Sequence, residues 1–324
     1  MGIDASMLPD LLRSADIAGK ISAPAASALG LLEGTPVVTG GGDGVCACVG
    51  AGVVAEGQVY NVIGSSSWIS MASRAPVYDP DIRTFNWAHM DPNLYAPCGT
   101  MQSAGYSLKW AKNELCRDDI ERASSRGVSA YALIDEMIAE TPPGANGLIF
   151  LPYLMGERSP RWNPEAKGCF IGLNANSSKY DMLRSVLEGV GYNLKVILDI
   201  FMEQITAEEI TVIGGGAKSA VWPQILADIW RKRLSVPLYL EEATAMGAAV
   251  CGGVGVGAFK DFSAVKRFIK PDRTVCPRAE YAETYEDMYR IFNRSYDQLV
   301  SVFEDLDQFQ KRINKPIQKV HLPV

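Results

Sequence analysis

Histidine is nearly absent from this sequence, and several features of common protein classes are missing as well. The 324 residues contain two histidines, His89 and His321, and the second stands close to the C-terminus. A Ser-His-Asp hydrolase and a histidine-rich zinc site both need well-placed imidazoles, so we expect neither. The net charge is -6 and no run of basic residues occurs, which excludes nucleic acid and anionic membranes as expected partners.

Cysteine pairs of the CxxC type and long apolar runs are also lacking. The seven cysteines have neither metal-site spacing nor the density of a secreted disulfide scaffold, so we expect reduced, mostly buried thiols. No apolar run reaches membrane-spanning length, and no signal peptide is recognisable. These absences predict a cytoplasmic globular protein, with enough residues for one large domain or two ordinary ones.

Short β-branched segments alternate with amphipathic segments along most of the chain. This alternation is typical of an α/β domain with a mixed sheet and flanking helices. The most regular helix is expected over residues 178–201, where apolar residues recur at steps of three and four and Ser178 with Asp181 forms a capping pattern. The other expected helices are 45–52, 101–115, 129–139, 220–231, 243–252 and 279–310, and the expected strands are 35–39, 58–62, 68–71, 84–89, 94–96, 148–151, 209–213 and 234–239.

Three glycine-rich turns follow predicted strands, at residues 40–44, 64–67 and 214–217. Glycine lets backbone N–H groups approach a phosphate, and the hydroxyls of residues 65–67 add donors. Tight turns also use glycine for steric reasons alone, but three of them in one α/β domain favour a nucleotide site. GxxxxGK[ST] is absent and no dinucleotide fingerprint follows a strand, so neither a P-loop nor a dinucleotide-binding dehydrogenase is expected.

Asp43 ends a strand and has glycine on both sides. A carboxylate in that position reaches into a cleft without competing side chains, as a base that accepts a hydroxyl proton must do during phosphoryl transfer. A helix N-cap aspartate has the same spacing. Both interpretations stay open on the residues alone.

Several motifs follow one another in a distinctive order. They are Gly40-Gly41-Gly42-Asp43, Gly64-Ser65-Ser66-Ser67, Leu151-Pro152-Tyr153, Gly156-Glu157-Arg158-Ser159-Pro160, then Gly168, Phe170, Gly172, Leu173, Asp181, Met182 and Ser185-Val186-Leu187-Glu188, and finally Gly214-Gly215-Gly216-Ala217. Together they resemble the FGGY carbohydrate kinases, most closely the xylulokinase-like branch. The stretch 168–188 fits the family's second signature at every defined position, and the similarity covers nearly the whole chain.

The resemblance implies a ribonuclease H-like, actin-type α/β fold, in which a sugar-binding and an ATP-binding domain close over a cleft. Residues 1–50 correspond to the tail of the N-terminal, sugar-binding domain, and residues 51–324 correspond to the C-terminal, ATP-binding domain. Asp43 resembles the family's catalytic base. The positions that resemble its nucleotide contacts are Gly64, Ser65, Ser66, Gly105, Gly214, Gly215, Gly216 and Ser219.

The resemblance also implies ATP and Mg²⁺ as cofactors. The family's D-x-G-T turn, which positions a magnesium-binding aspartate, has no counterpart here, since Asp4 is followed by Ala5 and Ser6. We therefore assign no metal ligand in this chain and expect the main one in a missing N-terminal domain. Because phosphoryl transfer needs both substrates in one closed cleft, the chain alone is expected to have little activity.

Three positions modify these expectations. Gly44 stands where relatives often carry a polar residue, and Ser219 stands where some carry asparagine. Arg158 is open to interpretation as a phosphate-binding arginine, but a role in a pinned structural loop is preferred because Glu157 and two prolines are close to it. The expected reaction is phosphorylation of a sugar hydroxyl, with D-xylulose favoured by similarity and other ketoses or polyols open. A non-catalytic, actin-like ATP-binding or regulatory module is the alternative. The exposed side of the last helix also allows a homodimer.

Overall fold

The centre of the molecule is a mixed seven-stranded sheet. The computed structural model describes residues 4–313. The sheet order is β11-β10-β9-β3-β4-β6-β5, where β9 runs parallel to β3 and β10 and the other neighbours are antiparallel. Its strands are β3 (Val59–Ile63), β4 (Ser67–Met71), β5 (Phe85–Ala88), β6 (Tyr95–Met101), β9 (Glu209–Ile213), β10 (Arg233–Pro237) and β11 (Pro271–Val275). The predicted α/β architecture with a mixed sheet is confirmed.

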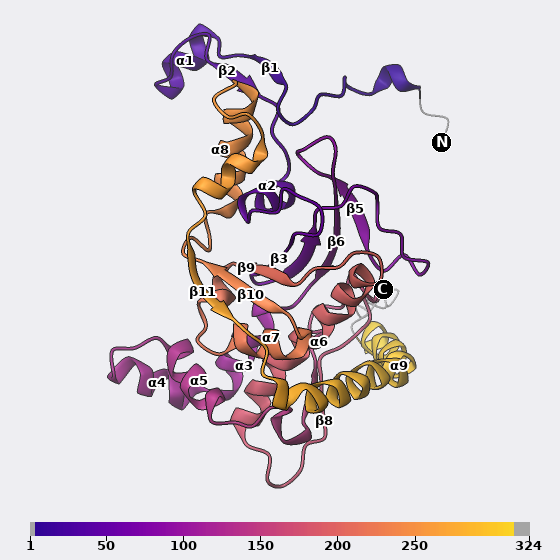
Figure 1. Cartoon of the computed structure of the whole chain (residues 1–324). Helices are drawn as coiled ribbons and strands as arrows, with labels where there is room; N and C mark the ends of the chain where they lie inside the picture. Colours follow the sequence, from indigo (N-terminus) through magenta and orange to yellow (C-terminus); the bar gives the residue numbers. More distant parts are fainter. Residues whose placement is uncertain (1–3, 314–324) are drawn as a thin grey trace, which may run out of the picture.

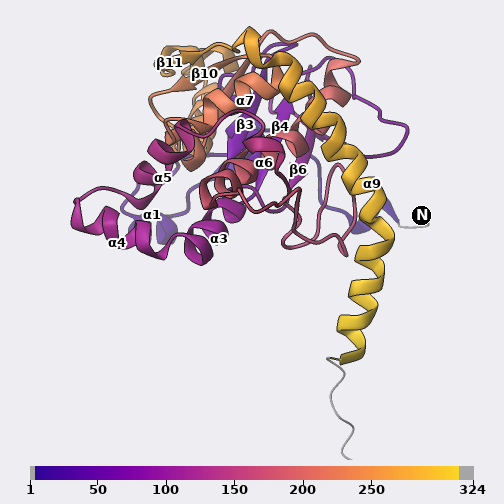
Figure 2. The ribbon, with the colours of Figure 1, turned by 90° about the horizontal axis from the view of Figure 1, so that it is seen from below.

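Helices cover both faces of this sheet (Figure 1). On one face lie α2 (Asp43–Gly50) and α8 (Ala243–Gly255), which are rich in small residues and pack against each other and β3. On the other face lie α3 (Gly105–Leu115), α6 (Lys179–Met202) and α7 (Trp222–Trp230). The long helix α9 (Ala282–Ile313) packs outside α6 and α7, and its end projects beyond the rest of the molecule in Figure 2.

Helix α6 shows how directly a local pattern specifies structure. Ser178 Oγ accepts from the backbone N–H of Asp181, and the Asp181 carboxylate accepts from the N–H of Ser178. This reciprocal capping box is the predicted one. The apolar stripe that begins with Leu183 is buried against the sheet, as the spacing requires.

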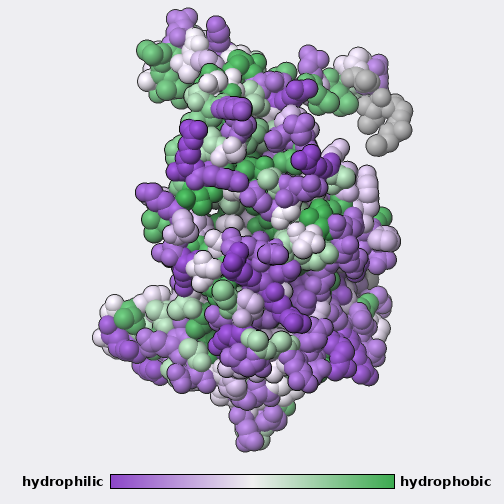
Figure 3. All heavy atoms as spheres, viewed as in Figure 1, coloured by the Kyte–Doolittle hydropathy of each residue, from purple (hydrophilic) through white to green (hydrophobic). Residues whose placement is uncertain are grey.

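Residues 4–40 form a peripheral unit. It contains a short 3₁₀ helix (Ala5–Met7), β1 (Ile17–Lys20), α1 (Ala23–Leu29) and β2 (Pro36–Val38). The two strands pair only with each other and lie beyond α8, at the top of Figure 1. Large apolar side chains of this unit, including Leu11 and Leu32, are exposed, and Figure 3 shows apolar surface gathered there.

The remaining elements are α4 (Arg117–Ser125), α5 (Ala130–Ala139), the β7–β8 pair (Ile149–Leu151 and Cys169–Ile171), and four short 3₁₀ helices (Ala145–Gly147, Gly215–Lys218, Phe262–Arg267 and Ala279–Tyr281). Several predicted boundaries were wrong: α2 begins two residues before the predicted helix 45–52, β6 continues from the predicted strand 94–96 to residue 101, and α3 begins only at Gly105. Within residues 4–313, no helix is long and apolar enough to cross a membrane. His321 lies outside the described residues.

Candidate active site

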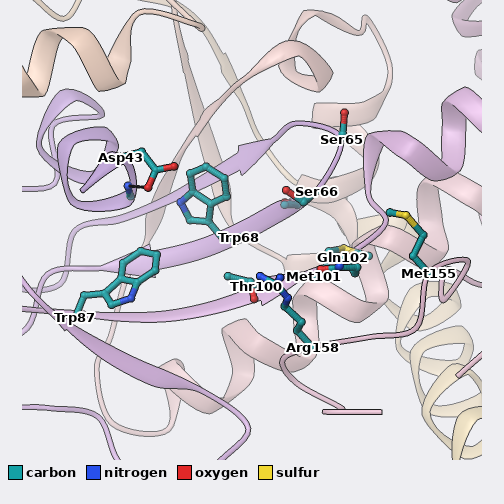
Figure 4. Close-up of a pocket in the computed structure, with 12 residues that line it drawn as sticks. Asp43, Ser65, Ser66, Trp68, Trp87, Thr100, Met101, Gln102, Met155 and Arg158 are labelled. Carbon is teal, nitrogen blue, oxygen red and sulfur yellow. Dashed lines mark hydrogen bonds between the residues drawn. The ribbon is translucent and has the colours of Figure 1, made fainter. Parts of the chain in front are cut away.

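A cavity of about 440 Å³ opens between the start of α2 and the turn that joins β3 to β4. It brings together three of the predicted site residues, Asp43, Ser65 and Ser66. In Figure 4 the indole of Trp68 lies between Asp43 and Ser66. The complete lining is Asp43, Gly44, Ser65, Ser66, Ser67, Trp68, Trp87, Thr100, Met101, Gln102, Met155 and Arg158.

Asp43 is the first residue of α2, and its side chain is exposed to the cavity. Gly42 occupies the N-cap position, so the N-cap interpretation of Asp43 is wrong. One carboxylate oxygen accepts from the N–H of Gly44 at 2.8 Å. Among the described residues the second oxygen has no protein donor, so it is free to accept a proton from a ligand.

Two tryptophans and a tyrosine fix the backbone beside Asp43. The Tyr60 hydroxyl donates to the carbonyl of Gly44 at 2.7 Å, and Trp68 Nε1 donates to that hydroxyl at 2.9 Å. The ring of Trp87 fills the space that a side chain at Gly44 would need, since a Cβ atom there would lie 2.4 Å from it. An aromatic wall therefore stands where a side chain at residue 44 would lie.

The turn between β3 and β4 presents two free hydroxyls. Ser65 and Ser66 are exposed, and within the part of the chain that the structure describes their side chains make no hydrogen bond. Ser67 differs, because its buried hydroxyl accepts from Asn61 Nδ2 and donates to the carbonyl of Val62. Only the first two serines are thus available to a ligand.

Gly105 does not line the cavity. Its N–H donates to the carbonyl of Gly64 at 2.9 Å, while the N–H groups of Ala104 and Tyr106 donate to the carbonyl of Ser65. A Cβ atom on Gly105 would lie 2.4 Å from the Gly64 oxygen. The start of α3 therefore anchors the turn, and its first donors are already used within the protein.

The turn after β9 also lies away from the cavity lining. It contains Gly214, Gly215, Gly216 and Ser219, and it touches the first turn because a Cβ atom on Gly214 would lie 2.7 Å from the Ile63 carbonyl. Gly215 alone faces open space, with its nearest neighbour at 3.9 Å. The sheet thus joins the two turns, but only one of them reaches Asp43.

Ser219 is already engaged. Its hydroxyl donates to Asp135 Oδ1 at 3.0 Å and accepts from the N–H groups of Val221 and Trp222 at the start of α7. Burial raises the pKa of Asp135, although hydrogen bonds from this turn act in the opposite direction. These bonds make Ser219 a structural link between α5 and α7.

Arg158 supplies the positive charge of the cavity. Its guanidinium is exposed there and forms no ion pair within residues 4–313. The neighbouring Glu157 is buried, and its carboxylate accepts from the N–H groups of Arg158 and Gln102 at 2.8 and 2.7 Å and from Asn193 Nδ2 at 2.9 Å. The pinned loop was correctly expected, but Glu157 is what pins it, and Arg158 is left facing the cavity.

The described residues do not supply a metal centre of their own. Among them, no group of three or more His, Cys, Asp or Glu side chains could hold a metal ion. Asp43 is the only carboxylate in the cavity lining. A Mg²⁺ ion in this cavity would therefore be bound mainly by groups other than these side chains.

Comparisons with known proteins point to one family for both parts of the chain. The C-terminal domain model of the FGGY family of carbohydrate kinases matches residues 59–256, and its N-terminal domain model matches residues 1–50. The chain belongs to the FGGY family of carbohydrate kinases. A xylulose kinase of Staphylococcus epidermidis is 35% identical over 303 residues, which cover 92% of this chain and 58% of that protein. A gluconokinase of Bacillus subtilis is 30% identical over 312 residues, which cover 96% of this chain and 60% of the gluconokinase.

The fold of an FGGY kinase is also present. The crystal structure of xylulose kinase from Rhodospirillum rubrum superposes with a TM-score of 0.79 at 30% identity, over 93% of this chain and 59% of that one. The ribonuclease H-like, actin-type α/β fold implied by the motifs is thus confirmed. The chain spans about 60% of the length of the FGGY relatives that it matches.

Proposed function

We propose that this chain forms the ATP-binding part of a sugar kinase, with Asp43 as the general base. The observation that carries the proposal is that one cavity holds the Asp43 carboxylate, the free hydroxyls of Ser65 and Ser66, and the unpaired guanidinium of Arg158. A carboxylate accepts the proton of the attacking sugar hydroxyl. Hydroxyls and a guanidinium are donors suited to the phosphoryl oxygens that carry charge during the transfer.

The nucleotide would extend from this cavity across the adjoining glycine turn. Gly215 is exposed, and the nearest atom to the place that a Cβ would take there is 3.9 Å away, so a ribose or base can approach its backbone. Gly64, Gly105, Gly214 and Gly216 would act indirectly, by packing the two turns against each other. In this proposal residues 51–324 are the ATP-binding domain, and residues 1–50 belong to the sugar-binding domain.

ATP would bring Mg²⁺ bound to its phosphates, and the ion would reduce the repulsion between the phosphates and the attacking oxygen. This chain's own residues would do the remaining work: Asp43 takes the proton, and Arg158 with the two serines orients the transferred group. Because the Asp43 side of the cavity is exposed, water is not excluded, so turnover by the chain alone should be low.

The substrate is proposed to be a small sugar or sugar acid, with D-xylulose first. The S. epidermidis relative supports xylulose, and the B. subtilis relative supports gluconate as the next choice. Trp68 and Trp87 form an aromatic wall beside Asp43, against which the carbon-bound hydrogens of a sugar can pack.

The test combines nucleotide binding with turnover. ATP titration should change tryptophan fluorescence through Trp68 and Trp87, and the change should be lost in the variant Trp68→Phe with Trp87→Phe. ADP release is then measured with xylulose, gluconate and glycerol, for this chain and for its whole reading frame where that extends further. We expect binding by the chain and turnover of one sugar by the whole frame. Binding without turnover of any sugar would indicate the non-catalytic module instead, and absence of binding would refute both.

A further inference from the structure

Asp43 stands in a segment that has almost no other side chains. Residues 40, 41, 42 and 44 are all glycine, and a Cβ atom on Gly40 or Gly42 would have no heavy atom within 4 Å apart from its neighbours in the chain. Gly42 is the N-cap of α2 and makes no side-chain hydrogen bond to the helix. Because glycine leaves the backbone more conformational freedom than any other residue, this segment by itself would hold the carboxylate of Asp43 only loosely.

Apart from Asp43 itself, two side chains in the described part of the chain bond to the backbone of residues 40–44. The thiol of Cys46 donates to the carbonyl of Gly41 at 3.3 Å, and a thiol is a weak donor. The hydroxyl of Tyr60 donates to the carbonyl of Gly44 at 2.7 Å. Tyr60 therefore makes the stronger of the two bonds, and its acceptor belongs to the residue directly after Asp43.

The side chain of Tyr60 is itself firmly held. It lies on β3, is 0% exposed, and packs in one cluster with Ala47 and Cys48 of α2. Trp68 Nε1 donates to the Tyr60 oxygen at 2.9 Å, so the hydroxyl proton is left for the Gly44 carbonyl. Burial raises the pKa of Tyr60 well above its ordinary value, so the hydroxyl stays protonated and remains a donor at neutral pH.

We propose that Tyr60 is a positioning residue, whose hydroxyl holds the first turn of α2 so that the Asp43 carboxylate faces the cavity. This role rests on the proposed one of Asp43 as the general base. Tyr60 does not line the cavity, so it acts only through the Gly44 carbonyl. A misplacement of the base by about 1 Å can cost roughly 10²-fold in rate, because the carboxylate, the sugar hydroxyl and the phosphoryl group must be aligned.

Tyr60→Phe tests the proposal in the whole reading frame, by ADP release with the sugar that it turns over best. The substitution keeps the buried ring and its packing and removes only the hydroxyl. We expect kcat to fall by roughly 10- to 100-fold, because the base is no longer held in place. The KM for the sugar and the Kd for ATP should change by less than about twofold, since the groups that bind both substrates are unaltered.

The variant that combines Tyr60→Phe with Asp43→Asn separates positioning from general damage. If the hydroxyl acts through the carboxylate, its loss has little left to disturb once the carboxylate is gone. Tyr60→Phe should therefore lower the residual turnover of Asp43→Asn by less than about threefold, far less than it lowers the turnover of the native enzyme. Losses that multiply fully in the double variant would show that Tyr60 acts independently of Asp43 and would overturn the proposal.

Tyr296→Phe is the matched control. Tyr296 is 7% exposed, and its hydroxyl accepts from Asn163 Nδ2 at 3.1 Å, away from the cavity lining. This variant also loses one buried hydroxyl, so it should lower thermal stability to a similar degree and leave kcat at the native value. Exchange of the backbone amide hydrogens of α2, measured on this chain alone, adds a readout without turnover. It should become faster in Tyr60→Phe and stay native in Tyr296→Phe, because only the first variant frees the start of α2.

The outcomes distinguish this role from that of the base. Native kcat in Tyr60→Phe, native amide exchange of α2 in that variant, or an equal loss of kcat in Tyr296→Phe would each overturn the positioning role alone, provided that Asp43→Asn is impaired. Near-native turnover of Asp43→Asn, or no turnover of any sugar by the whole reading frame, would refute the base and with it the role of Tyr60.

Discussion

Two glycine-rich turns lie side by side at one edge of the sheet, after the parallel neighbours β3 and β9, and they use their polar atoms differently. The turn after β3 points the hydroxyls of Ser65 and Ser66 into the cavity of Asp43. The turn after β9 has its hydroxyl, on Ser219, bonded to Asp135 and to the start of α7. Turns of similar composition therefore offer their hydroxyls to a ligand in one case and use them for internal packing in the other.

The difference lies in what surrounds each turn. Beside the first turn, Glu157 takes up backbone donors and leaves the guanidinium of Arg158 free. Beside the second, the Arg273 guanidinium is turned to the backbone: its Nη2 donates to the carbonyls of Ala217 and Ser219, and its Nε is buried without a partner among residues 4–313. A polar group that already has its partners offers little to a ligand, whereas an unpartnered one at a cavity is ready to bind.

The largest expected effect is that of Asp43→Asn on turnover. An amide cannot accept the hydroxyl proton, so kcat should fall by roughly 10²–10⁴, the usual contribution of a positioned base. The assay is ADP release by the whole kinase. Because Asp43 is exposed, the midpoint of thermal unfolding should stay the same.

The matched control is Asp135→Asn, which changes the α5 carboxylate that binds the second turn. It is 8% exposed and holds Ser219 and Ala220 through hydrogen bonds, so its substitution should lower stability while changing kcat much less. Near-native kcat in Asp43→Asn would make the aspartate a structural residue and would remove the contrast between the turns.

Glu157, which anchors the cavity loop, should make stability depend on pH. Burial raises its pKa from 4.5 to about 8, although donated hydrogen bonds oppose the shift. A carboxyl whose pKa is higher in the folded state stabilises the fold below the ordinary pKa, and this contribution is lost as pH rises to the folded value. The free energy of unfolding should thus fall between pH 4.5 and about 8, by at most about 1.4 kcal/mol per unit.

Urea unfolding at several pH values in this window measures the slope. Glu157→Gln should remove that part of the slope, whereas the exposed Glu241→Gln should leave the native slope intact. If unfolding free energy depended on pH equally steeply in the Glu157 variant and in the native chain, the pKa of this carboxyl would not differ between the folded and unfolded states.

How far the sequence could predict these features depended on the distance between the interacting residues. The capping box of Ser178 and Asp181 spans three residues, and its prediction was confirmed. The glycine turns were also found, because turn chemistry is local. A phosphate-binding role of Arg158 was considered but a structural role was preferred, because the free guanidinium depends on contacts of Glu157 with Gln102 and Asn193, 55 and 36 residues away.

The order of the sheet and several short elements were likewise beyond local patterns. Strand β11 has exposed and half-buried positions and owes its conformation to pairing with β10. Helix α4 has a strongly polar sequence, in which Ile120 and Ala123 are the apolar residues, too few to indicate a helix from their spacing. In both cases tertiary contacts, more than intrinsic preference, select the structure.

Gly105→Ala tests the packing between α3 and the first turn. The new Cβ atom would lie 2.4 Å from the backbone oxygen of Gly64, so the turn must shift, and we expect a loss of about 1–3 kcal/mol in unfolding free energy. Gly215→Ala is the control in the second turn, where the nearest atom is 3.9 Å away. Equal stability of the two variants would mean that Gly105 is not needed for close packing.

The smallest expected effects are those of removing one serine hydroxyl from each turn, at Ser65 and at Ser219. These two variants compare the roles of the turns in binding and in packing most directly. Ser219→Ala removes the hydroxyl that binds Asp135 and the N–H of Trp222, so it should cost about 1 kcal/mol of stability and leave nucleotide affinity intact. Ser65→Ala removes an exposed, unpartnered hydroxyl, so stability should stay the same while ATP affinity falls by roughly three- to tenfold. Unfolding curves measure the stability of both variants, and fluorescence titration measures their affinity for ATP. If Ser219→Ala also weakened ATP binding, the link that Ser219 makes between α5 and α7 would be needed for the nucleotide site, and packing and binding would not be separate there.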